Sequence, residues 1–457
     1  MESQYPLLED DISASEIITP HGSELLIYNT STGEKKYPNR AVFNFLRLAT
    51  GRRTFREITE ELSRQSGESY EEIWPGLSLL AESMVKDKLL QVSDSPFENT
   101  RKPPSSVEMV HRLENVSFET TRQCNLRCKH CYANASMKLE DELTLEEIRA
   151  LIDQLTDIGV LSFIFTGGEP LLHPHIFELI EYARKKPLSV FLFTNGTLLT
   201  PEIVEKLKEL QVLQVNISID GSDEKTHDEF RGSKGAYKKT IQSVKMLRKA
   251  GIGVEISVSL HKGNYRKIKE ILKLLKDLGV NQYKLWPITF SGRPETKDIF
   301  ITPAEFREVM VLNREFEFEE LGKKEKEEFK YVKSLKNCGV GMGTLTLKCN
   351  GWVTSCPMFG EDVSFGNIRE TPIIDMWNDS PLLNKLRAMS VFEIEPCKTC
   401  EFAAACKGGC IGDIYQRSGK FTCHDEYVCQ LFDVVRNDFI PVEVDDKKSR
   451  SLSVEVV

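Results

Sequence analysis

The twelve cysteines of the chain are concentrated in two regions. Three of them lie within eight residues at 124–131, nine lie between residues 338 and 429, and the segment 132–337 has none. A disulfide framework would distribute cysteines so that they staple the whole chain, whereas clustered cysteines are typical of metal ligands. The distribution therefore predicts two metal-rich regions separated by a segment that folds around an ordinary core.

The composition describes a globular chain without an overall basic character. Of 457 residues, 40% are hydrophobic and 28% are charged, and the length allows two or three folded domains. The net charge of −9 gives no support to a nucleic-acid partner, although an acidic chain can still carry a local basic groove. The acidic start has no basic n-region, and no apolar run reaches the length of a membrane span. We therefore expect a cytoplasmic protein with no membrane partner, whose cysteines stay reduced.

Residues 1–93 are predicted to form an independent module. Two capping boxes, Thr54-x-x-Glu57 and Ser69-x-x-Glu72, open two helices. Strand patterns at 23–30, 35–38 and 89–92 and a further helical pattern at 39–48 complete the module. This order of strands and three short helices predicts a winged-helix-like fold. Residues 94–112 are rich in Pro, Ser and charge and are predicted to be a linker.

Strand and helix patterns alternate through residues 113–325. The clearest helix spans 144–158, and Thr200-Pro201 and Thr302-Pro303 place proline at the first helical position. Nearly apolar runs of strand length lie at 116–120, 161–166, 188–194, 212–219, 252–260 and 282–287. The predicted fold class is therefore α/β, with a partial (β/α)6 TIM-type barrel whose chemistry lies at the C-terminal ends of its strands.

The remainder of the chain is predicted to form a cysteine-rich domain at 326–440 and a polar tail at 441–457. A highly charged stretch at 318–336 precedes the cysteines and is expected to be a solvated helix or linker.

The first cysteine group, Cys124-x3-Cys128-x2-Cys131, directly follows the first barrel strand. Three thiolates can bind three irons of a 4Fe–4S cube and leave the fourth iron open for a non-protein ligand. His130 lies inside the motif and would complete a zinc site, so zinc stays open as an alternative on these residues alone.

This spacing, with the aromatic Tyr132 beside the last cysteine, resembles the radical S-adenosylmethionine (SAM) superfamily. The resemblance implies that the open iron chelates the amino and carboxylate groups of the cofactor's methionine part. An electron, from a donor such as flavodoxin or ferredoxin, then splits the sulfonium and releases a 5′-deoxyadenosyl radical that abstracts a substrate hydrogen. The protein positions and shields that chemistry.

Short motifs of glycine and polar residues follow the second, third and fourth barrel strands. They occur in the same order as the motifs of this family. Gly167-Gly168-Glu169 resembles the family's GGE motif, which hydrogen-bonds the cofactor's amino group. Each motif alone fits ordinary turn chemistry, whereas all of them in order favour a cofactor site. No catalytic base is assigned, and neither His227 nor Asp228 is singled out for that role. The resemblance implies further cofactor contacts from Tyr132, from Asn195, from Ser218 and Asp220 at the ribose or methionine part, and from Arg231 at the carboxylate.

The C-terminal cysteines follow a second pattern, which resembles the SPASM extension of radical SAM enzymes. The pattern is Cys338-x12-Gly351-x4-Cys356, then Cys397-x2-Cys400-x5-Cys406-x3-Cys410, then Cys429. Members of that family bind two auxiliary 4Fe–4S clusters, so the resemblance implies three 4Fe–4S clusters and SAM as cofactors. Two zinc ribbons are the alternative. By position, the resemblance assigns the first auxiliary cluster to Cys338, Cys356 and Cys410, and the second to Cys397, Cys400, Cys406 and Cys429.

Two cysteines are left over. Cys349 is the candidate fourth ligand of the first auxiliary cluster, which otherwise has an open iron available to a substrate thiol. Cys423 is the rival of Cys429, which is preferred because residues 425–429 look more like the family's closing segment.

The N-terminal module narrows the substrate class. Its order of elements resembles the peptide-recognition element of many peptide-modifying radical enzymes, in which the precursor's leader adds as a strand to a small sheet. A DNA-binding winged helix and a structural cap are the alternatives. The whole chain resembles maturases of ribosomally made peptides, of the sactipeptide and ranthipeptide type, which implies SAM-dependent oxidative thioether formation between a cysteine sulfur and a carbon.

Other reactions of radical SAM enzymes use the same clusters. Carbon–carbon crosslinking of a peptide, oxidation of a protein residue and modification of a porphyrin remain alternatives within the superfamily. A zinc-rich protein that binds peptides without chemistry is the alternative from another class.

Overall fold

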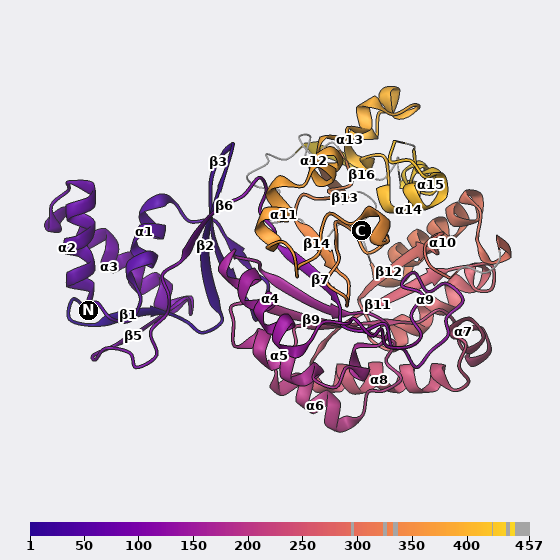
Figure 1. Ribbon diagram of the computed structural model, residues 1–457, viewed down its shortest axis with the longest axis horizontal. Coiled ribbons are helices and arrows are strands. Elements are labelled where there is room, and N and C mark those ends of the chain that lie inside the picture. The colour runs from indigo at the N-terminus through magenta and orange to yellow at the C-terminus, as the bar shows by residue number, and fades with distance from the viewer. Residues whose placement is uncertain (294–296, 323–326, 332–336, 423, 436–438, 444–457) are drawn as a thin grey trace. The chain divides into compact units, whose positions relative to one another are not determined.

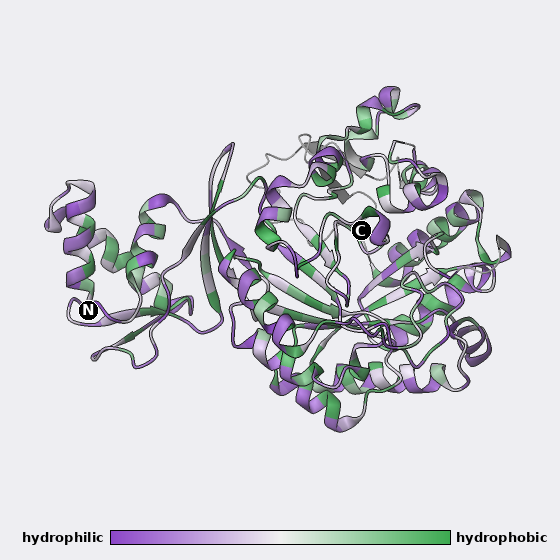
Figure 2. Cartoon of the chain, in the orientation of Figure 1, coloured by the Kyte–Doolittle hydropathy of each residue, from purple (hydrophilic) through white to green (hydrophobic). Residues whose placement is uncertain are grey.

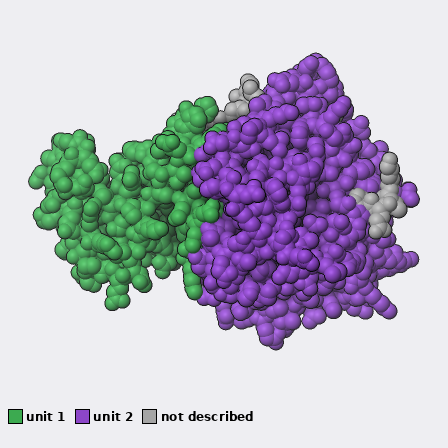
Figure 3. Space-filling model, viewed as in Figure 1, with its two compact units in different colours: residues 1–114, 152–162, 183–189 green, residues 115–151, 163–182, 190–457 purple. Residues whose placement is uncertain are grey.

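The structure, a computed structural model, describes residues 1–293, 297–322, 327–331, 337–422, 424–435 and 439–443. The chain divides into two compact units (Figure 3). The first comprises residues 1–114 with 152–162 and 183–189, and the second comprises residues 115–151, 163–182 and 190–457. No helix among the described residues is both long and apolar enough to cross a membrane.

The first unit contains two small sheets. β1 pairs with β5, and the other four strands form a sheet in the order β4-β3-β2-β6 (Figure 1). β2 and β3 form an antiparallel hairpin in which Ile12 lies opposite Asn29 and Thr19 lies opposite Gly22. The three predicted strands are confirmed as β3, β4 and β5, whereas β1 and β2 are additional to the prediction. The strands are β1 (Tyr5–Leu8), β2 (Ile12–Thr19), β3 (Gly22–Asn29), β4 (Lys35–Lys36), β5 (Leu90–Ser93) and β6 (Ser105–Glu108).

Three helices pack against these strands: α1 (Arg40–Leu48), α2 (Phe55–Ser66) and α3 (Tyr70–Lys86). Both predicted capping boxes are present, between Thr54 and Glu57 and between Ser69 and Glu72, so the backbone N–H groups at both helix starts are satisfied. The apolar sides of the helices form one core with β1, β2, β3 and β5.

Strand β6 lies inside the segment 94–112 that was expected to be a linker. It pairs in parallel with residues 15–18 of β2. The Glu16 carboxylate accepts hydrogen bonds from Ser106 Oγ at 2.7 Å and from Arg40 Nη2 at 2.6 Å. The prediction is therefore wrong for the four residues of β6, because pairing with a distant strand overrides a local composition rich in Pro and Ser.

The second unit is built on the predicted barrel strands, all six of which are confirmed. β7 to β12 are consecutive neighbours in the sheet, and β9 to β12 pair in parallel. Figure 2 shows hydrophobic residues along these strands, and β8 is buried at four of its five residues, whereas buried and partly exposed residues alternate along β11. The strands are β7 (Asn115–Glu119), β8 (Ser162–Thr166), β9 (Ser189–Thr194), β10 (Gln214–Ser218), β11 (Gly253–Leu260) and β12 (Gln282–Pro287).

The connecting helices cover the outside of this sheet, as α4, α5, α6 and α8 show in Figure 1. This arrangement is an α/β, partial TIM-type barrel, as predicted. Its loops after the strand ends therefore meet at one end of the sheet. The helices are α4 (Leu145–Asp157), α5 (Ile176–Arg184), α6 (Pro201–Glu209), α7 (Glu224–Arg231), α8 (Ala236–Ala250), α9 (Ile268–Asp277) and α10 (Pro303–Leu321).

The cysteine-rich region shares the barrel sheet, a connection that the sequence did not predict. β14 (Thr344–Leu347) pairs in parallel with β7, and β15 (Val353–Thr354) pairs antiparallel with β14. The charged stretch 318–336 contains the end of α10 and a strand, β13 (Glu327–Tyr331), which pairs with β16 (Phe439–Glu443). Most of the predicted tail, 444–457, lies outside the described residues. The remaining helices are α11 (Ile373–Asp379), α12 (Pro381–Ala388), α13 (Ala403–Cys406), α14 (Ile411–Ser418) and α15 (Glu426–Val435).

Candidate active site

The loop that follows β7 brings Cys124, Cys128 and Cys131 together in one packed group. Burial raises the pKa of Cys124 to about 11, so its free thiol is protonated at neutral pH and would lose a proton on binding iron. Each sulfur also accepts one hydrogen bond, which favours the thiolate once a metal is bound. The donors are Leu126 N for Cys124 (3.4 Å), Ala135 N for Cys131 (3.3 Å) and Arg231 Nη1 for Cys128 (3.7 Å).

His130 does not complete a zinc site with these cysteines. Its buried ring stacks on Phe230 with 4.4 Å between ring centroids, and its Nε2 lies 3.2 Å from Ser259 Oγ. Burial keeps the pKa of His130 well below its usual range, so the ring is neutral. Among the described residues, no three His, Cys, Asp or Glu side chains are arranged to hold a single metal ion. Three thiols in one group without a fourth protein ligand fit a cluster with an open iron.

The turn after β8 holds the cysteine loop by close backbone contacts. Gly168 N donates to Thr121 O at 2.8 Å, and Glu169 N donates to Gln123 O at 2.8 Å. A Cβ at Gly168 would lie 2.3 Å from Gln123 O, so only glycine allows this approach. The last two residues of the GGE motif, Gly168 and Glu169, thereby position the backbone that leads into Cys124.

The Glu169 side chain is fully buried at the end of β8. Its carboxylate accepts hydrogen bonds from Thr194 Oγ1 at 2.7 Å, from Asn195 N at 2.9 Å and from Leu171 N at 3.1 Å. Burial raises the pKa of Glu169 to about 7 in spite of these donors. A cofactor ammonium beside this carboxylate would favour its ionised form.

Asn195 connects the end of β9 with the cysteine loop. Its Nδ2 donates to Asn125 Oδ1 at 2.9 Å, and Asn125 Nδ2 donates to Thr197 Oγ1 at 2.8 Å. Ser218 is the last residue of β10 and is partly exposed. Both predicted positions therefore lie at strand ends on the side of the barrel that carries the cysteines.

Asp220 and Arg231 bind one another inside the protein. Arg231 Nη2 lies 2.5 Å from Asp220 Oδ2, and Asp220 Oδ1 accepts the N–H of Ser259 at 2.8 Å. Burial raises the pKa of Asp220, while Arg231 and the Ser259 N–H lower it. The resemblance predicts cofactor contacts for both residues, whereas here they form an ion pair that presents the Arg231 guanidinium to the sulfur of Cys128.

A buried ion pair that the sequence did not reveal lies beside Tyr132. Lys348 Nζ lies 2.8 Å from Glu119 Oε1, and both side chains are buried. Burial, with the nearby Glu119 carboxylate, raises the pKa of Tyr132, so its hydroxyl stays protonated. No sequence signal marks Lys348 as the partner of Glu119, because the two residues lie far apart in the chain on the paired strand ends of β14 and β7.

The predicted ligands of the first auxiliary cluster come together in the second unit. Burial raises the pKa of Cys356 to about 12, and the neighbouring Cys338 raises it further. Burial also raises the pKa of Cys410 well above its usual range, with contributions from Cys356 and Cys338. The three cysteines therefore interact, which fits a shared cluster.

Cys349 lies beside the segment that leads into α4. It is 1% exposed, and its backbone oxygen accepts the N–H of Leu143 at 2.7 Å. Burial raises the pKa of Cys349 to about 12, and the charges that act on it are those of Glu142, Glu119, Arg122 and Asp141. The assignment of Cys349 as the fourth ligand of the first auxiliary cluster stays a prediction.

The second auxiliary set is also assembled. Burial raises the pKa of Cys406 to about 12, and Cys429 and Cys397 contribute to the increase. Burial likewise raises the pKa of Cys429 to about 11, with contributions from Cys397 and Cys400. Cys429 therefore lies with the other three cysteines, while its rival Cys423 falls outside the described residues.

Asp425 connects the two auxiliary groups, because its backbone oxygen accepts the N–H of Cys429 at 3.0 Å while its carboxylate binds the N–H of Cys410. No specific sign in the sequence marks this role. Asp425 Oδ2 accepts the N–H of Cys410 at 3.1 Å, and its Oδ1 accepts from Arg417 Nη2 at 3.2 Å. Arg417 Nη2 also lies 2.6 Å from Asp413 Oδ2. A Cβ at Gly409 would lie 2.1 Å from the Cβ of Asp425, so the chain passes directly over this carboxylate.

Two family models match the chain. The model of the radical SAM superfamily matches residues 118–278, and SPASM, an iron–sulfur cluster-binding domain, matches residues 338–401. The AdoMet-dependent heme synthase of Methanosarcina barkeri is 32% identical over 345 residues, which cover 70% of this chain and 97% of that protein. The antilisterial bacteriocin subtilosin biosynthesis protein AlbA of Bacillus subtilis is 29% identical over 428 residues, which cover 90% of this chain and 93% of AlbA.

Solved structures share the fold at low sequence identity. SuiB of Streptococcus suis, bound to its precursor peptide SuiA, has a TM-score of 0.64 and 16% identity, covering 93% of this chain and all of that chain. The structure anSMEcpe with bound AdoMet has a TM-score of 0.58 and 18% identity, covering 75% of this chain and all of that chain.

Proposed function

The chain belongs to the radical SAM superfamily and carries a SPASM iron–sulfur domain, and on this premise we propose that it modifies a ribosomally made peptide by forming a thioether. The family implies 4Fe–4S clusters and SAM as cofactors. We assign one cluster to each of the three cysteine groups, which gives three clusters. When bound, these groups supply hydrogen-atom abstraction and the uptake of one electron.

The proposal of a peptide substrate rests on how much of the chain aligns with AlbA. The alignment with AlbA leaves about a tenth of the chain uncovered. Even if all of the uncovered residues lay among the first 114, they would be less than half of them. The relative that serves subtilosin biosynthesis therefore shares much of the first unit as well as the barrel. The heme synthase match covers 70% of the chain.

The first unit has a strand edge suited to a peptide. β4 pairs with β3 only at Ile27 and Tyr28, so the first half of β3 borders no other strand of this sheet on that side. An extended leader can add to such an edge through main-chain hydrogen bonds. This edge supports the proposal that the first unit binds the precursor.

The position of Cys349 supports thioether chemistry. We propose that Cys338, Cys356 and Cys410 would hold the first auxiliary cluster without Cys349, whose thiol feels the charges of Glu142 and Arg122. The thiolate of the substrate would then complete the cluster. The reaction would balance as follows: bound SAM would supply the radical that takes one hydrogen atom from the acceptor carbon, the substrate thiol would lose its proton, the surplus electron would pass to an auxiliary cluster, and a C–S bond would form.

The test is to co-express the enzyme with any short cysteine-containing peptide that is encoded beside its gene and to analyse that peptide by mass spectrometry. We expect the loss of two hydrogens for each link, with the linked cysteine resistant to alkylation. A peptide that loses two hydrogens while its cysteines stay open to alkylation indicates carbon–carbon crosslinking instead.

Porphyrin modification is the second candidate, favoured by the 32% identity to the heme synthase over 97% of that protein. It is examined by incubating the reduced enzyme and SAM anaerobically with an iron porphyrin. Conversion of the porphyrin, without any change to the peptides, would overturn the peptide proposal.

A further inference from the structure

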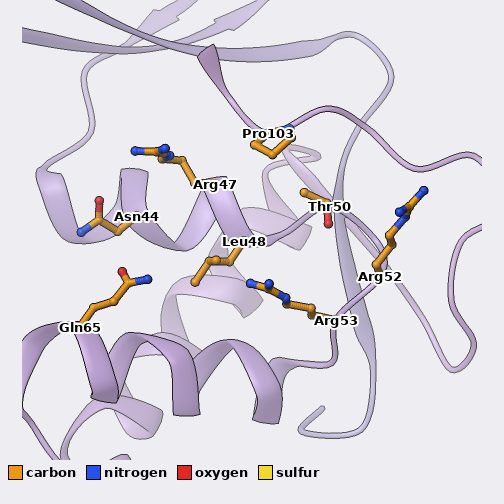
Figure 4. A pocket seen from close by; sticks show the side chains of 8 residues that line it. All are labelled: Asn44, Arg47, Leu48, Thr50, Arg52, Arg53, Gln65 and Pro103. Carbon is orange, nitrogen blue, oxygen red and sulfur yellow. The ribbon is translucent and has the colours of Figure 1, made fainter. Parts of the chain in front are cut away.

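Three unpaired arginines line one pocket of the first unit. The pocket has a volume of about 440 Å³ and is lined by residues of α1, of the turn between α1 and α2, of the last turn of α2 and of the segment before β6 (Figure 4). It contains no acidic side chain. Its lining residues are Asn44, Arg47, Leu48, Thr50, Arg52, Arg53, Gln65 and Pro103.

These arginines differ from the others of the first 114 residues, all of which the structure describes. The other five arginines each form an ion pair with a carboxylate. Arg47, Arg52 and Arg53 form none, and all three are exposed. In a chain with a net charge of −9, unpaired arginines confined to one pocket indicate a site for negative charge.

The backbone that presents the arginines is held on both sides. Gly51 N donates to Pro6 O at 2.9 Å, and Phe97 N donates to Gly51 O at 3.1 Å. Gly51 has a φ of +80°, and a Cβ there would lie 3.0 Å from Phe97. Arg52 and Arg53 therefore project from a fixed turn, so little conformational freedom of the backbone is lost when they bind an anion.

The other groups of the pocket narrow the class of ligand. Arg52 Nε donates to Thr100 Oγ1 at 3.2 Å, which orients its remaining N–H groups. Figure 4 shows Arg53 extending towards Leu48, while Gln65 on α2 points towards α1, which carries Asn44. Gln65 Nε2 donates to Glu61 Oε1 at 2.8 Å, which leaves its amide oxygen to accept from a ligand. Guanidinium groups suit carboxylates, the Asn44 amide and the Gln65 amide oxygen suit a peptide backbone, and Leu48 with Pro103 supplies an apolar surface.

We propose that this pocket binds an acidic segment of the precursor's leader, rich in Asp and Glu around an aliphatic residue. This inference rests on the proposed function, because the leader is its occupant. It adds a charge-selective anchor that lies apart from the edge of β3 and contributes to selection of the correct precursor.

The test uses the full-length protein and a fluorescein-labelled decapeptide with four Asp or Glu residues around a central Leu. Fluorescence anisotropy should show binding that weakens with added salt, and the same peptide with Asn and Gln should bind at least tenfold more weakly. The double variant Arg47→Gln/Arg53→Gln should lose at least tenfold in affinity. The matched control Arg64→Gln removes an exposed arginine of α2 that pairs with Glu61 and should stay within twofold of the wild type.

Several results would overturn the inference: no salt-dependent binding to the wild type, equal binding by the double variant, or tighter binding of a single-stranded oligonucleotide of equal charge. Circular dichroism of each variant shows whether it is folded. Modification of a precursor peptide is measured separately. If no peptide is modified but the acidic decapeptide still binds through Arg47 and Arg53, the proposed function is wrong, whereas the inference that this pocket binds an acidic peptide is confirmed.

Discussion

Lys348 Nζ lies 2.8 Å from Glu119 Oε1, in an ion pair whose two side chains are 10% and 2% exposed. The pair connects β14, next to the first auxiliary cysteines, with the end of β7, which leads into Cys124. Since removal of one partner leaves a buried charge unpaired, Lys348→Met should destabilise the second unit by about 3–5 kcal/mol. Urea unfolding followed by tryptophan fluorescence measures this change, because Trp286, Trp352 and Trp377 all lie in that unit.

The double variant Lys348→Met/Glu119→Gln removes both charges and is the matched control. It should unfold at a higher urea concentration than Lys348→Met alone. An unchanged midpoint for Lys348→Met would show that the pair contributes nothing to the stability of the second unit.

Gly168→Ala should disrupt the cysteine loop. The added Cβ would lie 2.3 Å from the carbonyl oxygen of Gln123, which is backbone and cannot move without displacing Cys124. We expect anaerobically reconstituted Gly168→Ala to bind less iron and to form at least tenfold less 5′-deoxyadenosine than the wild type. Gly76→Ala is the control, because a Cβ there meets nothing within 4 Å in the middle of α3. It should leave both measurements unchanged and stabilise the helix by about 0.5–1 kcal/mol.

The stability of β6 should depend on acid pH through Glu16. A hydrogen bond from Arg40, with a further one from Ser106, lowers the pKa of Glu16 from 4.5 to about 2. A carboxyl whose pKa is lowered by folding stabilises the fold above its unfolded pKa. That contribution is lost as the pH falls from about 4.5 to about 2.

Hydrogen exchange of the amides of 105–108, corrected for the intrinsic rate, should therefore show protection that falls over this pH range. Glu16→Gln should lower the protection at neutral pH by about 1.5–3 kcal/mol and flatten its pH dependence. The same pH profile in wild type and Glu16→Gln would contradict this role of Glu16.

How much of this architecture was predictable depends on the range of the interactions. The six barrel strands were predictable because each is a local apolar run bounded by turn residues. The capping boxes at Thr54 and Ser69 were predictable because cap and partner lie three residues apart. The cysteine groups followed from spacing and resemblance.

What could not be predicted depends on contacts between distant parts of the chain. β14 pairs with β7 across more than two hundred residues, and neither segment has a local sequence pattern that identifies the other as its partner strand. The same holds for Lys348 with Glu119. The resemblance assigned Asp220 and Arg231 to the cofactor, and only the three-dimensional arrangement shows that they pair with one another and reach Cys128.

The surroundings of Cys349 give a direct prediction for iron content. Cys349→Ala should bind as much iron as the wild type, because the charges that act on its thiol are those of Glu142, Glu119, Arg122 and Asp141. Cys356→Ala is the comparison and should lose about four irons per chain. If Cys349→Ala lost the same amount, Cys349 would be a ligand of that cluster.

The central claim is that Cys124, Cys128 and Cys131 hold the cluster that cleaves SAM. The most direct measurement is 5′-deoxyadenosine formation by the anaerobically reconstituted, reduced protein, compared with a variant in which all three cysteines are Ala. We predict that the wild type forms 5′-deoxyadenosine and that the variant forms none while it retains about eight irons in the auxiliary groups. Continued formation of 5′-deoxyadenosine by the variant would contradict the assignment.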